Sequence, residues 1–334
     1  MPPRRAEPPV YSLVIPLYNE EAVLPVLLHR LDGLLRQLDG PAEVVMVDDG
    51  STDTTGIVAA ARAKDDPRYR YLALSRNFGH QIAISAGMDV STGDAVIVMD
   101  ADLQDPPEVV LDLVAKWREG FEIVYARRLS RDGESRLKRW TAEWFYRSLR
   151  LVTAVDIPAD VGDFRLVDRK AIEVFRAMPE RDRFVRGMFA WMGFRHTAVD
   201  FHRMPRLAGS SGYSWPRMLR LAIDGIVSFS DAPLRVALWL GATISLCAFA
   251  YGLHIAWVAL FDDGLVRGWA STVVLLSLLS GVNLLMTGVV GLYVGRIHSE
   301  VKQRPLYIVG RKVGFTEQRD ADEHSDARPL SLNP

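Results

Sequence analysis

The 334-residue chain contains a single cysteine, Cys247, and this residue lies within an apolar run. One cysteine excludes an internal disulfide framework and any multi-cysteine zinc or iron–sulfur site. An excess of charge of either sign is also missing, because 41 acidic residues balance 40 lysines and arginines. A nearly neutral chain lacks the broad basic field of a protein that coats nucleic acid, so we expect no nucleic acid partner.

Several common enzyme motifs are absent as well. The first expected strand is not followed by G-x-G-x-x-G, and G-K-[ST], H-E-x-x-H and G-x-S-x-G do not occur. These absences argue against a dinucleotide-binding fingerprint, a P-loop, a zincin site and a nucleophile elbow. The N-terminal apolar stretch from Tyr11 to Leu17 breaks at Asn19, so we expect no signal peptide.

Two long apolar runs stand near the C-terminus. The segments from Val236 to Leu260 and from Trp269 to Val294 each extend for about 25 residues without a formal charge. At about 1.5 Å per residue, each helix is long enough to cross a hydrocarbon core of about 30 Å. The pattern therefore predicts two transmembrane helices, in preference to a pair of buried core helices.

The charges that flank the two runs predict their orientation. Three arginines within 217–235 precede the first run, and five basic residues within 296–312 follow the second. The short connection carries Asp262, Asp263 and only one basic residue, Arg267. By the positive-inside rule, we expect a multi-pass protein of the inner (plasma) membrane with both termini in the cytoplasm.

The first third of the chain alternates short β-rich runs with amphipathic helical patterns. Such alternation predicts an α/β fold with a mainly parallel sheet and helices on both faces, in which ligands collect at the carboxyl ends of the strands. The expected strands are Ser12–Pro16, Glu43–Val47, Tyr71–Ser75 and Ala95–Met99, and the expected helices are Glu21–Leu38, Thr54–Lys64 and His80–Val90.

Acidic motifs follow two of these strands. Asp100 and Asp102 come directly after one strand, with Gln104 beside them, and Asp48 and Asp49 end another. Carboxylates with this spacing offer hard oxygen ligands to Mg²⁺ or Mn²⁺, which also bind substrate phosphates. Adjacent carboxylates at one sheet edge would repel each other unless a cation or N–H donors were supplied. A nucleotide with its metal ion supplies both.

Taken together, the motifs of residues 11–310 resemble the family 2 glycosyltransferases of GT-A fold. The closest resemblance is to polyprenyl-phosphate glycosyltransferases of the bactoprenol glucosyltransferase type, which are related to dolichyl-phosphate mannose synthase. The motifs that carry the resemblance are Val14-Ile-Pro-Leu-Tyr-Asn-Glu-Glu21, Asp48-Asp-Gly-Ser-Thr-Asp53, Ser75-Arg-Asn-Phe-Gly79, Asp100-Ala-Asp-Leu-Gln-Asp-Pro-Pro-Glu108, Gly162-Asp-Phe-Arg-Leu166 and Ser228-Phe-Ser230 before Pro233-Leu-Arg235.

The resemblance implies a nucleotide-sugar site built from the strand-end motifs. Asp48 or Asp49 would read the N–H edge of the base, and Ala101 would lie against the donor. Arg206 would sit on a mobile loop that closes on the donor diphosphate. The implied metal ligands are Asp100, Asp102 and Gln104, and the implied residues of the nucleotide pocket also include Pro16, Tyr18 and Glu20.

The resemblance also implies an acceptor site. Arg128, Arg131 and Lys138 would bind the acceptor phosphate, and Asp163 would lie near the reacting anomeric carbon; Asp102, Asp163 and Arg128 are thus the implied catalytic residues. The mobile loop departs from the family, because Gly212 occupies the position where relatives often carry lysine.

The implied reaction is inverting transfer of a sugar to undecaprenyl or another polyprenyl phosphate. UDP-glucose is the favoured donor, and GDP-mannose is the main alternative. A processive polysaccharide synthase and an inactive two-span adaptor are weaker readings. A small-x-x-x-small face at Gly291 and Gly295 allows packing into a homo-oligomer.

The expected organisation places a flexible N-terminus before the catalytic domain and a disordered tail at the C-terminus. Helices over 134–153 and 215–229 are amphipathic and suited to contact membrane lipid at the interface. The expected segments are residues 1–10, the glycosyltransferase domain 11–212, the amphipathic segment 213–235, the two spans within 236–294, a cytoplasmic segment 295–315 and the tail 316–334.

Overall fold

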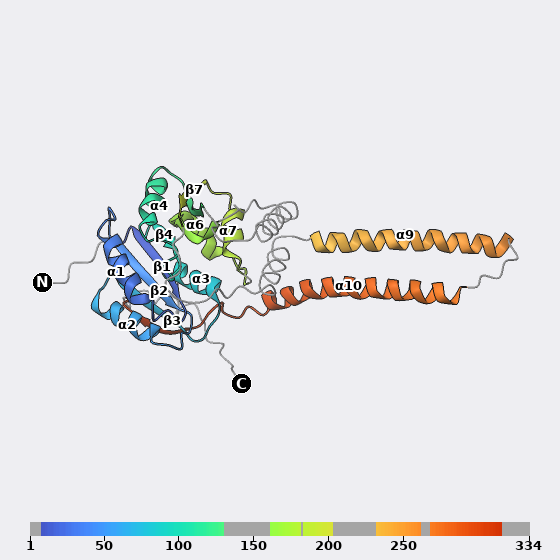
Figure 1. Ribbon diagram of the computed structural model, residues 1–334, viewed down its shortest axis with the longest axis horizontal. Helices are drawn as coiled ribbons and strands as arrows, with labels where there is room; N and C mark the ends of the chain where they lie inside the picture. The colour runs from blue at the N-terminus through green and yellow to red at the C-terminus, as the bar shows by residue number, and fades with distance from the viewer. Residues whose placement is uncertain (1–7, 130–160, 182, 203–231, 262–267, 316–334) are drawn as a thin grey trace, which may run out of the picture.

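A single mixed sheet organises the N-terminal part of the computed structural model, which describes residues 8–129, 161–181, 183–202, 232–261 and 268–315 (Figure 1). Within these ranges the sheet has eight strands in the order β7-β5-β6-β4-β1-β2-β3-β8. The strands are β1 (Tyr11–Leu17), β2 (Ala42–Asp48), β3 (Tyr69–Leu74), β4 (Ala95–Val98), β5 (Ile123–Arg128), β6 (Val161–Asp168), β7 (His196–Phe201) and β8 (Val309–Val313).

Strands β4, β1, β2 and β3 run parallel to one another and form the centre of the sheet. They read as nearly unbroken apolar runs because parallel strands are covered on both faces. Strand β6 runs antiparallel to β4 on one side, and β8 runs antiparallel to β3 on the other. Strand β5 is antiparallel to β6 and parallel to β7. The expected mainly parallel α/β sheet is therefore confirmed.

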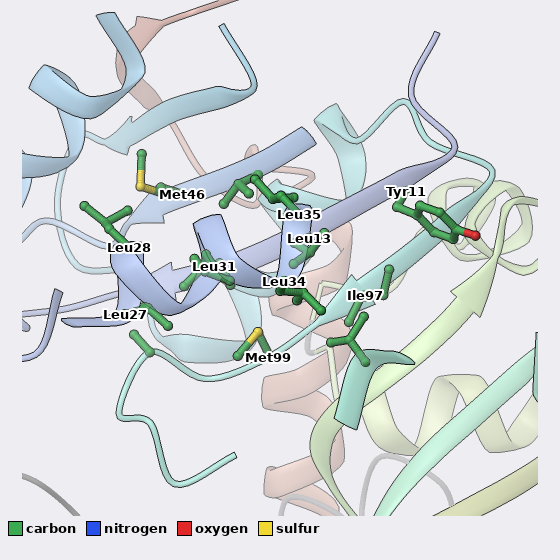
Figure 2. Close-up of a cluster of buried hydrophobic side chains, with 14 of the residues drawn as sticks. Tyr11, Leu13, Leu27, Leu28, Leu31, Leu34, Leu35, Met46, Ile97 and Met99 are labelled. Carbon is green, nitrogen blue, oxygen red and sulfur yellow. The ribbon is translucent and has the colours of Figure 1, made fainter. Parts of the chain in front are cut away.

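Helices cover both faces of this sheet. Figure 2 shows helix α1 (Leu24–Leu35) laid across the sheet, with Leu27, Leu31 and Leu34 directed at side chains of the central strands. The helix begins at Leu24, where Pro25 in its first turn favours a start, and not at Glu21 as expected. One face carries α1 (Leu24–Leu35), α2 (Thr55–Asp65) and α4 (Val109–Arg118), and the other carries α3 (His80–Val90), α6 (Arg169–Ala177) and α7 (Val185–Trp191).

Two long helices, α9 (Ala232–Phe261) and α10 (Trp269–Val301), run side by side away from the sheet (Figure 1). Their apolar windows, Pro233–Tyr251 and Leu278–Val301, have mean hydropathies of 1.5 and 1.7, and none of either window is buried. By length and composition both helices could cross a membrane. They contain the two runs that the sequence singled out.

After α10 the chain returns to the sheet, which the sequence did not lead us to expect. Strand β8 adds to the edge of β3, and the backbone N–H of Ser75 donates to the carbonyl of Ile308 at 2.8 Å. The hydroxyl of Tyr307 donates to Asp89 at 3.1 Å. The segment that follows the second apolar helix is thus joined directly to the sheet. The expected helices over 134–153 and 215–229 and the tail 316–334 lie outside the described residues.

Candidate active site

A cleft of about 320 Å³ opens at the carboxyl ends of the central parallel strands. Because β4, β1 and β2 are neighbours and run in the same direction, the loops that follow them converge at one edge of the sheet. The residues that line the cleft are Pro16, Leu17, Tyr18, Glu20, Asp49, Asn77, Gly79, His80, Ala83, Asp100, Ala101 and Asp102.

The antiparallel direction of β6 brings Asp163 to the same edge. Arg165 pairs with Val98, the last residue of β4. Continuing this register by two residues brings Asp163 of β6 opposite Asp100, which follows β4. Asp163 is buried, with 5% of its surface exposed. Residues that lie 63 positions apart in the chain therefore meet beside the cleft through strand pairing alone.

The two adjacent aspartates at the end of β2 have different partners. Asp48 points into the protein, where it accepts hydrogen bonds from the Ser51 backbone at 2.8 Å and from the Tyr71 hydroxyl at 2.7 Å. Burial and the hydrogen bond to Asp48 raise the pKa of Tyr71 well above its usual value. Asp49 lines the cleft instead, so of this pair it is the one placed to meet a ligand.

Asp49 also anchors the loop that follows β3. Its carboxylate accepts hydrogen bonds from the backbone N–H groups of Phe78 at 2.7 Å and Gly79 at 2.9 Å. Burial raises the pKa of Asp49 despite these two donors. Gly50 has φ of +71°, and a Cβ there would lie 2.6 Å from the Asn77 backbone nitrogen, so only glycine permits this close approach of the two loops.

The turn after β4 presents Asp100 and Asp102 to the cleft. Leu103 adopts a left-handed conformation with φ of +57°, which costs a leucine about 1–2 kcal/mol. This turn lets the Gln104 backbone N–H donate to Asp102 at 3.1 Å. Such strain, held by the surrounding packing because Leu103 is 2% exposed, is typical of functional sites.

The chemistry of Asp100 and Asp102 suits a divalent cation. Oxygen Oδ1 of Asp100 is buried without a hydrogen bond of good geometry, and burial raises the pKa of this carboxyl group. Across the described residues, no three His, Cys, Asp or Glu side chains converge into a complete metal cage. Mg²⁺ commonly binds through one or two carboxylates, with waters and substrate phosphates completing the shell, so this donor pair fits such an ion.

Asp163 is held by a cluster of donors. Arg186 donates to its two carboxylate oxygens at 2.9 and 3.0 Å, Arg165 donates at 3.3 Å, and the Gln81 side-chain amide donates at 3.2 Å. Burial alone would raise the pKa of Asp163, but Arg186, His80 and Arg165 outweigh burial and hold it well below the usual value. Asp163 is therefore a fixed anion at neutral pH.

The ring of His80 lies between Asp163 and Asp100. Its Nε2 is 3.4 Å from Oδ2 of Asp163 and 3.3 Å from Oδ1 of Asp100. Burial opposes protonation, but the contact with Asp163 and the charges of both carboxylates raise the pKa of His80. Because 47% of its side chain is exposed, the ring also faces the cleft.

Arg128 ends β5 close to the start of β6. Its Nη2 lies 3.6 Å from Oδ1 of Asp105, which is 1% exposed, and a Cβ at Gly162 would approach the same nitrogen to 3.0 Å. The guanidinium therefore packs over the residue that precedes Asp163. There is room for the guanidinium of Arg128 because Gly162 has no side chain.

Comparison with known proteins is decisive for the family. A family model described as "Glycosyl transferase family 2" matches residues 12–175. The glycosyltransferase YkcC of Bacillus subtilis is 46% identical over 92% of this chain and 96% of its own length. This chain belongs to glycosyl transferase family 2.

Other relatives carry more specific names. The SfII prophage-derived bactoprenol glucosyl transferase of Shigella flexneri is 41% identical to this glycosyltransferase, over 89% of this chain and 96% of its own length. Among solved structures, glucosyl-3-phosphoglycerate synthase from Mycobacterium tuberculosis, in complex with Mn²⁺, UDP-glucose and phosphoglyceric acid, matches with a TM-score of 0.45 and 21% identity, over 66% of this chain and 78% of that chain.

The structure of this glycosyltransferase brings most of the predicted donor residues together. Asp48 and Gln104 are buried and do not line the cleft, and Arg128 packs over Gly162 without lining the cleft. Three predicted residues, Arg131, Lys138 and Arg206, lie outside the described residues. The predicted residues that line the cleft are Pro16, Tyr18, Glu20, Asp49, Asp100, Ala101 and Asp102.

Sequence reasoning missed the partners of Asp163. His80 and Gln81 follow Ser75-Arg-Asn-Phe-Gly79, which comes after another parallel strand, so their place at a strand end was a usable signal. Arg186 gave no such signal. It lies on α7, 23 residues after Asp163, and only the packing of that helix brings it to the carboxylate.

Proposed function

We propose that this glycosyltransferase moves glucose from UDP-glucose to a polyprenyl phosphate such as undecaprenyl phosphate, with inversion at the anomeric carbon. The observation that carries the proposal is the environment of Asp163. A general base works best when its pKa lies near the operating pH, and the donors around Asp163 hold its pKa far below that value. The acceptor that fits is one that has no proton to lose.

A phosphate monoester meets this condition. Its second pKa is about 6, so it is mostly dianionic at neutral pH. An acceptor oxygen attacks the anomeric carbon, and the bond from that carbon to the diphosphate oxygen breaks, so the electron pair leaves with the nucleoside diphosphate. The named relatives support glucose and a bactoprenol acceptor, because the Shigella flexneri relative shares 41% identity along most of the chain.

Each described residue of the site has a separate proposed role in this reaction. Asp49, which lines the cleft, would read the base of the donor. Arg128, which packs over Gly162, would supply a cation for the acceptor phosphate. Asp163, as a fixed anion, stabilises positive charge that develops on the sugar. Positioning and charge neutralisation, without proton transfer, then account for catalysis.

Asp100 and Asp102 would hold a divalent ion, Mg²⁺ or Mn²⁺, at the diphosphate end of the cleft. When bound, that ion supplies positive charge that neutralises the leaving diphosphate. The buried Oδ1 of Asp100 supports this role. Gln104, whose Oε1 is buried without a hydrogen-bond partner, is a less direct candidate because it does not line the cleft.

We propose that α9 and α10 span the inner membrane, with the sheet domain on the cytoplasmic side. A polyprenyl phosphate keeps its head group at the membrane surface. A domain tethered there meets its acceptor at a raised effective concentration. The connection of α10 to the sheet through β8 supports this arrangement, since the domain is then joined to its anchor by strand pairing as well as by the chain before α9.

One panel tests the proposal. Detergent-purified protein is incubated with undecaprenyl phosphate, Mn²⁺ or Mg²⁺, and one labelled nucleotide-sugar at a time, and label in the lipid phase is counted. We expect UDP-glucose to give the most lipid-linked sugar. A preference for GDP-mannose would change the assigned donor from UDP-glucose to GDP-mannose, but the type of reaction would stay the same. No transfer and no hydrolysis of any donor would favour the inactive adaptor.

A further inference from the structure

His80 lies between two carboxylates of the candidate site, Asp100 and Asp163. It is the first residue of α3 and follows Gly79, whose φ of +104° turns the chain into the helix. One ring nitrogen, Nε2, lies 3.3 Å from Asp100 and 3.4 Å from Asp163. Asp100 lies in the turn after β4 and Asp163 lies in β6, so the ring contacts residues from two neighbouring parts of the sheet.

The two carboxylates lie on either side of Nε2 of His80, and Asp163 is the more buried of the two. Asp163 has 6% of its side chain exposed and Asp100 has 26%. Two negative charges at close range repel unless a donor lies between them, and the repulsion grows as either charge is buried. His80 supplies that donor, because its Nε2 is within reach of both. The contacts are long, as hydrogen bonds in a ligand-free site often are before they tighten on substrate.

The backbone around His80 is itself anchored on both sides. Before it, the N–H groups of Phe78 and Gly79 donate to Asp49. After it, Gln81 donates to Asp163 at 3.2 Å and accepts from the backbone N–H of Val185, in the first turn of α7, at 3.2 Å. The imidazole is therefore presented by a fixed segment and not by a freely moving side chain.

We propose that His80 is a positioning residue of the transfer step, whose Nε2 holds Asp100 and Asp163 at a set separation. Asp100 belongs to the diphosphate end of the cleft and Asp163 to the sugar end. The ring thereby sets the distance between the leaving group and the sugar. This inference rests on the proposed function, since it assumes those two ends.

Loss of the ring is expected to slow transfer more than it weakens nucleotide binding. In the proposed function Asp49 reads the base, and its contacts with the backbone N–H groups of Phe78 and Gly79 do not involve the His80 ring. A misplacement of about 1 Å at the reacting centre, in contrast, costs about 100-fold in rate. We therefore expect His80→Ala to lower kcat by about 100-fold, with the Kd for UDP in the presence of Mn²⁺ within about threefold of wild type.

The experiment compares His80→Ala, His80→Gln and the control His29→Ala in full-length protein in detergent. The Nε2 of glutamine can take the place of the imidazole Nε2, so His80→Gln should recover about tenfold of the lost kcat. His29 is an exposed histidine of α1, and its replacement should leave kcat unchanged. The readouts are kcat and KM for UDP-glucose with undecaprenyl phosphate, the Kd for UDP, and Tm.

Three results would overturn the inference. The first is a wild-type kcat in His80→Ala. The second is a parallel loss of kcat, UDP affinity and Tm, which indicates a merely structural role. The third is a His80→Gln variant no better than His80→Ala. A wild type that transfers nothing to undecaprenyl phosphate would instead reject the proposed acceptor, and the same ordering of variants would then be sought in hydrolysis of the nucleotide-sugar.

Discussion

Replacement of Asp163 by asparagine is expected to destabilise the protein as well as to inactivate it. The change keeps the volume and one oxygen but removes the charge that balances Arg165 and Arg186. Arg165 is fully buried, and Arg186 contacts both oxygens of Asp163. Removing one partner of a buried ion pair costs about 3–5 kcal/mol, because an uncompensated charge is left inside.

The expected loss can be read as a change in Tm. At about 2–4 °C per kcal/mol for a domain of this size, about 3–5 kcal/mol corresponds to a decrease of roughly 6–20 °C. The surface pair Asp200 and Arg127 provides a matched control, because its two hydrogen bonds, at 2.6 and 2.9 Å, are also bidentate but exposed. Asp200→Asn should shift Tm by no more than about 2 °C.

The pH dependence gives a second readout of the same pair. The pKa of Asp163 is lower in the folded protein than in the unfolded chain, so its stabilisation is complete above about pH 4 and is lost as pH falls through the lower, folded-state pKa. Asp163→Asn should remove this acid-sensitive component. Thermal unfolding in detergent between neutral and acid pH measures it. A Tm equal to wild type in Asp163→Asn would show that Asp163 does not balance the charges of Arg165 and Arg186.

Asp102→Asn should abolish transfer while the protein stays folded, and a metal chelator should abolish the activity of the wild type. Near-normal activity of the Asp102→Asn variant at saturating Mn²⁺ would disprove the metal assignment. Gly162→Ala should raise KM for the acceptor, because the new Cβ would stand 3.0 Å from Nη2 of Arg128, and an unchanged acceptor KM would remove Arg128 from the site. In a cysteine-free background, a cysteine in place of exposed Ile57 should resist an impermeant reagent added to intact cells, and one at position 264 should react; the reverse pattern would invert the topology.

Much of the fold was predictable because short segments of the sequence show the apolar patterns of strands and helices. The central parallel strands were found from their apolar runs, and the helix His80–Val90 was predicted with the bounds that the structure shows. Strand β8 was missed because Val309–Val313 includes Arg311 and Lys312 and has three of its five residues exposed, so it carries no buried pattern. Its position at the sheet edge depends on pairing with β3, more than 200 residues earlier.

In the candidate site, too, some residues could be predicted from the sequence and others only from the packing. Asp49, Asp100 and Asp102 follow strands, so the parallel sheet alone predicts that they meet. The roles within the Asp48 and Asp49 pair were not separable from sequence, because only packing shows that Asp48 turns toward Tyr71. Arg186 could not be found either, since its contact with Asp163 depends on how α7 packs against the sheet.

The most direct test of the central claim is the transfer assay with purified wild-type protein. UDP-glucose labelled in the sugar is mixed with undecaprenyl phosphate and Mn²⁺, and the product is extracted into the lipid phase and its anomeric configuration determined. We expect a metal-dependent glucosyl phospholipid with inverted configuration, and no transfer to undecaprenol, which lacks the phosphate. Equal transfer to the alcohol would contradict it, because an alcohol must lose a proton and Asp163 is held as an anion too weakly basic to take it.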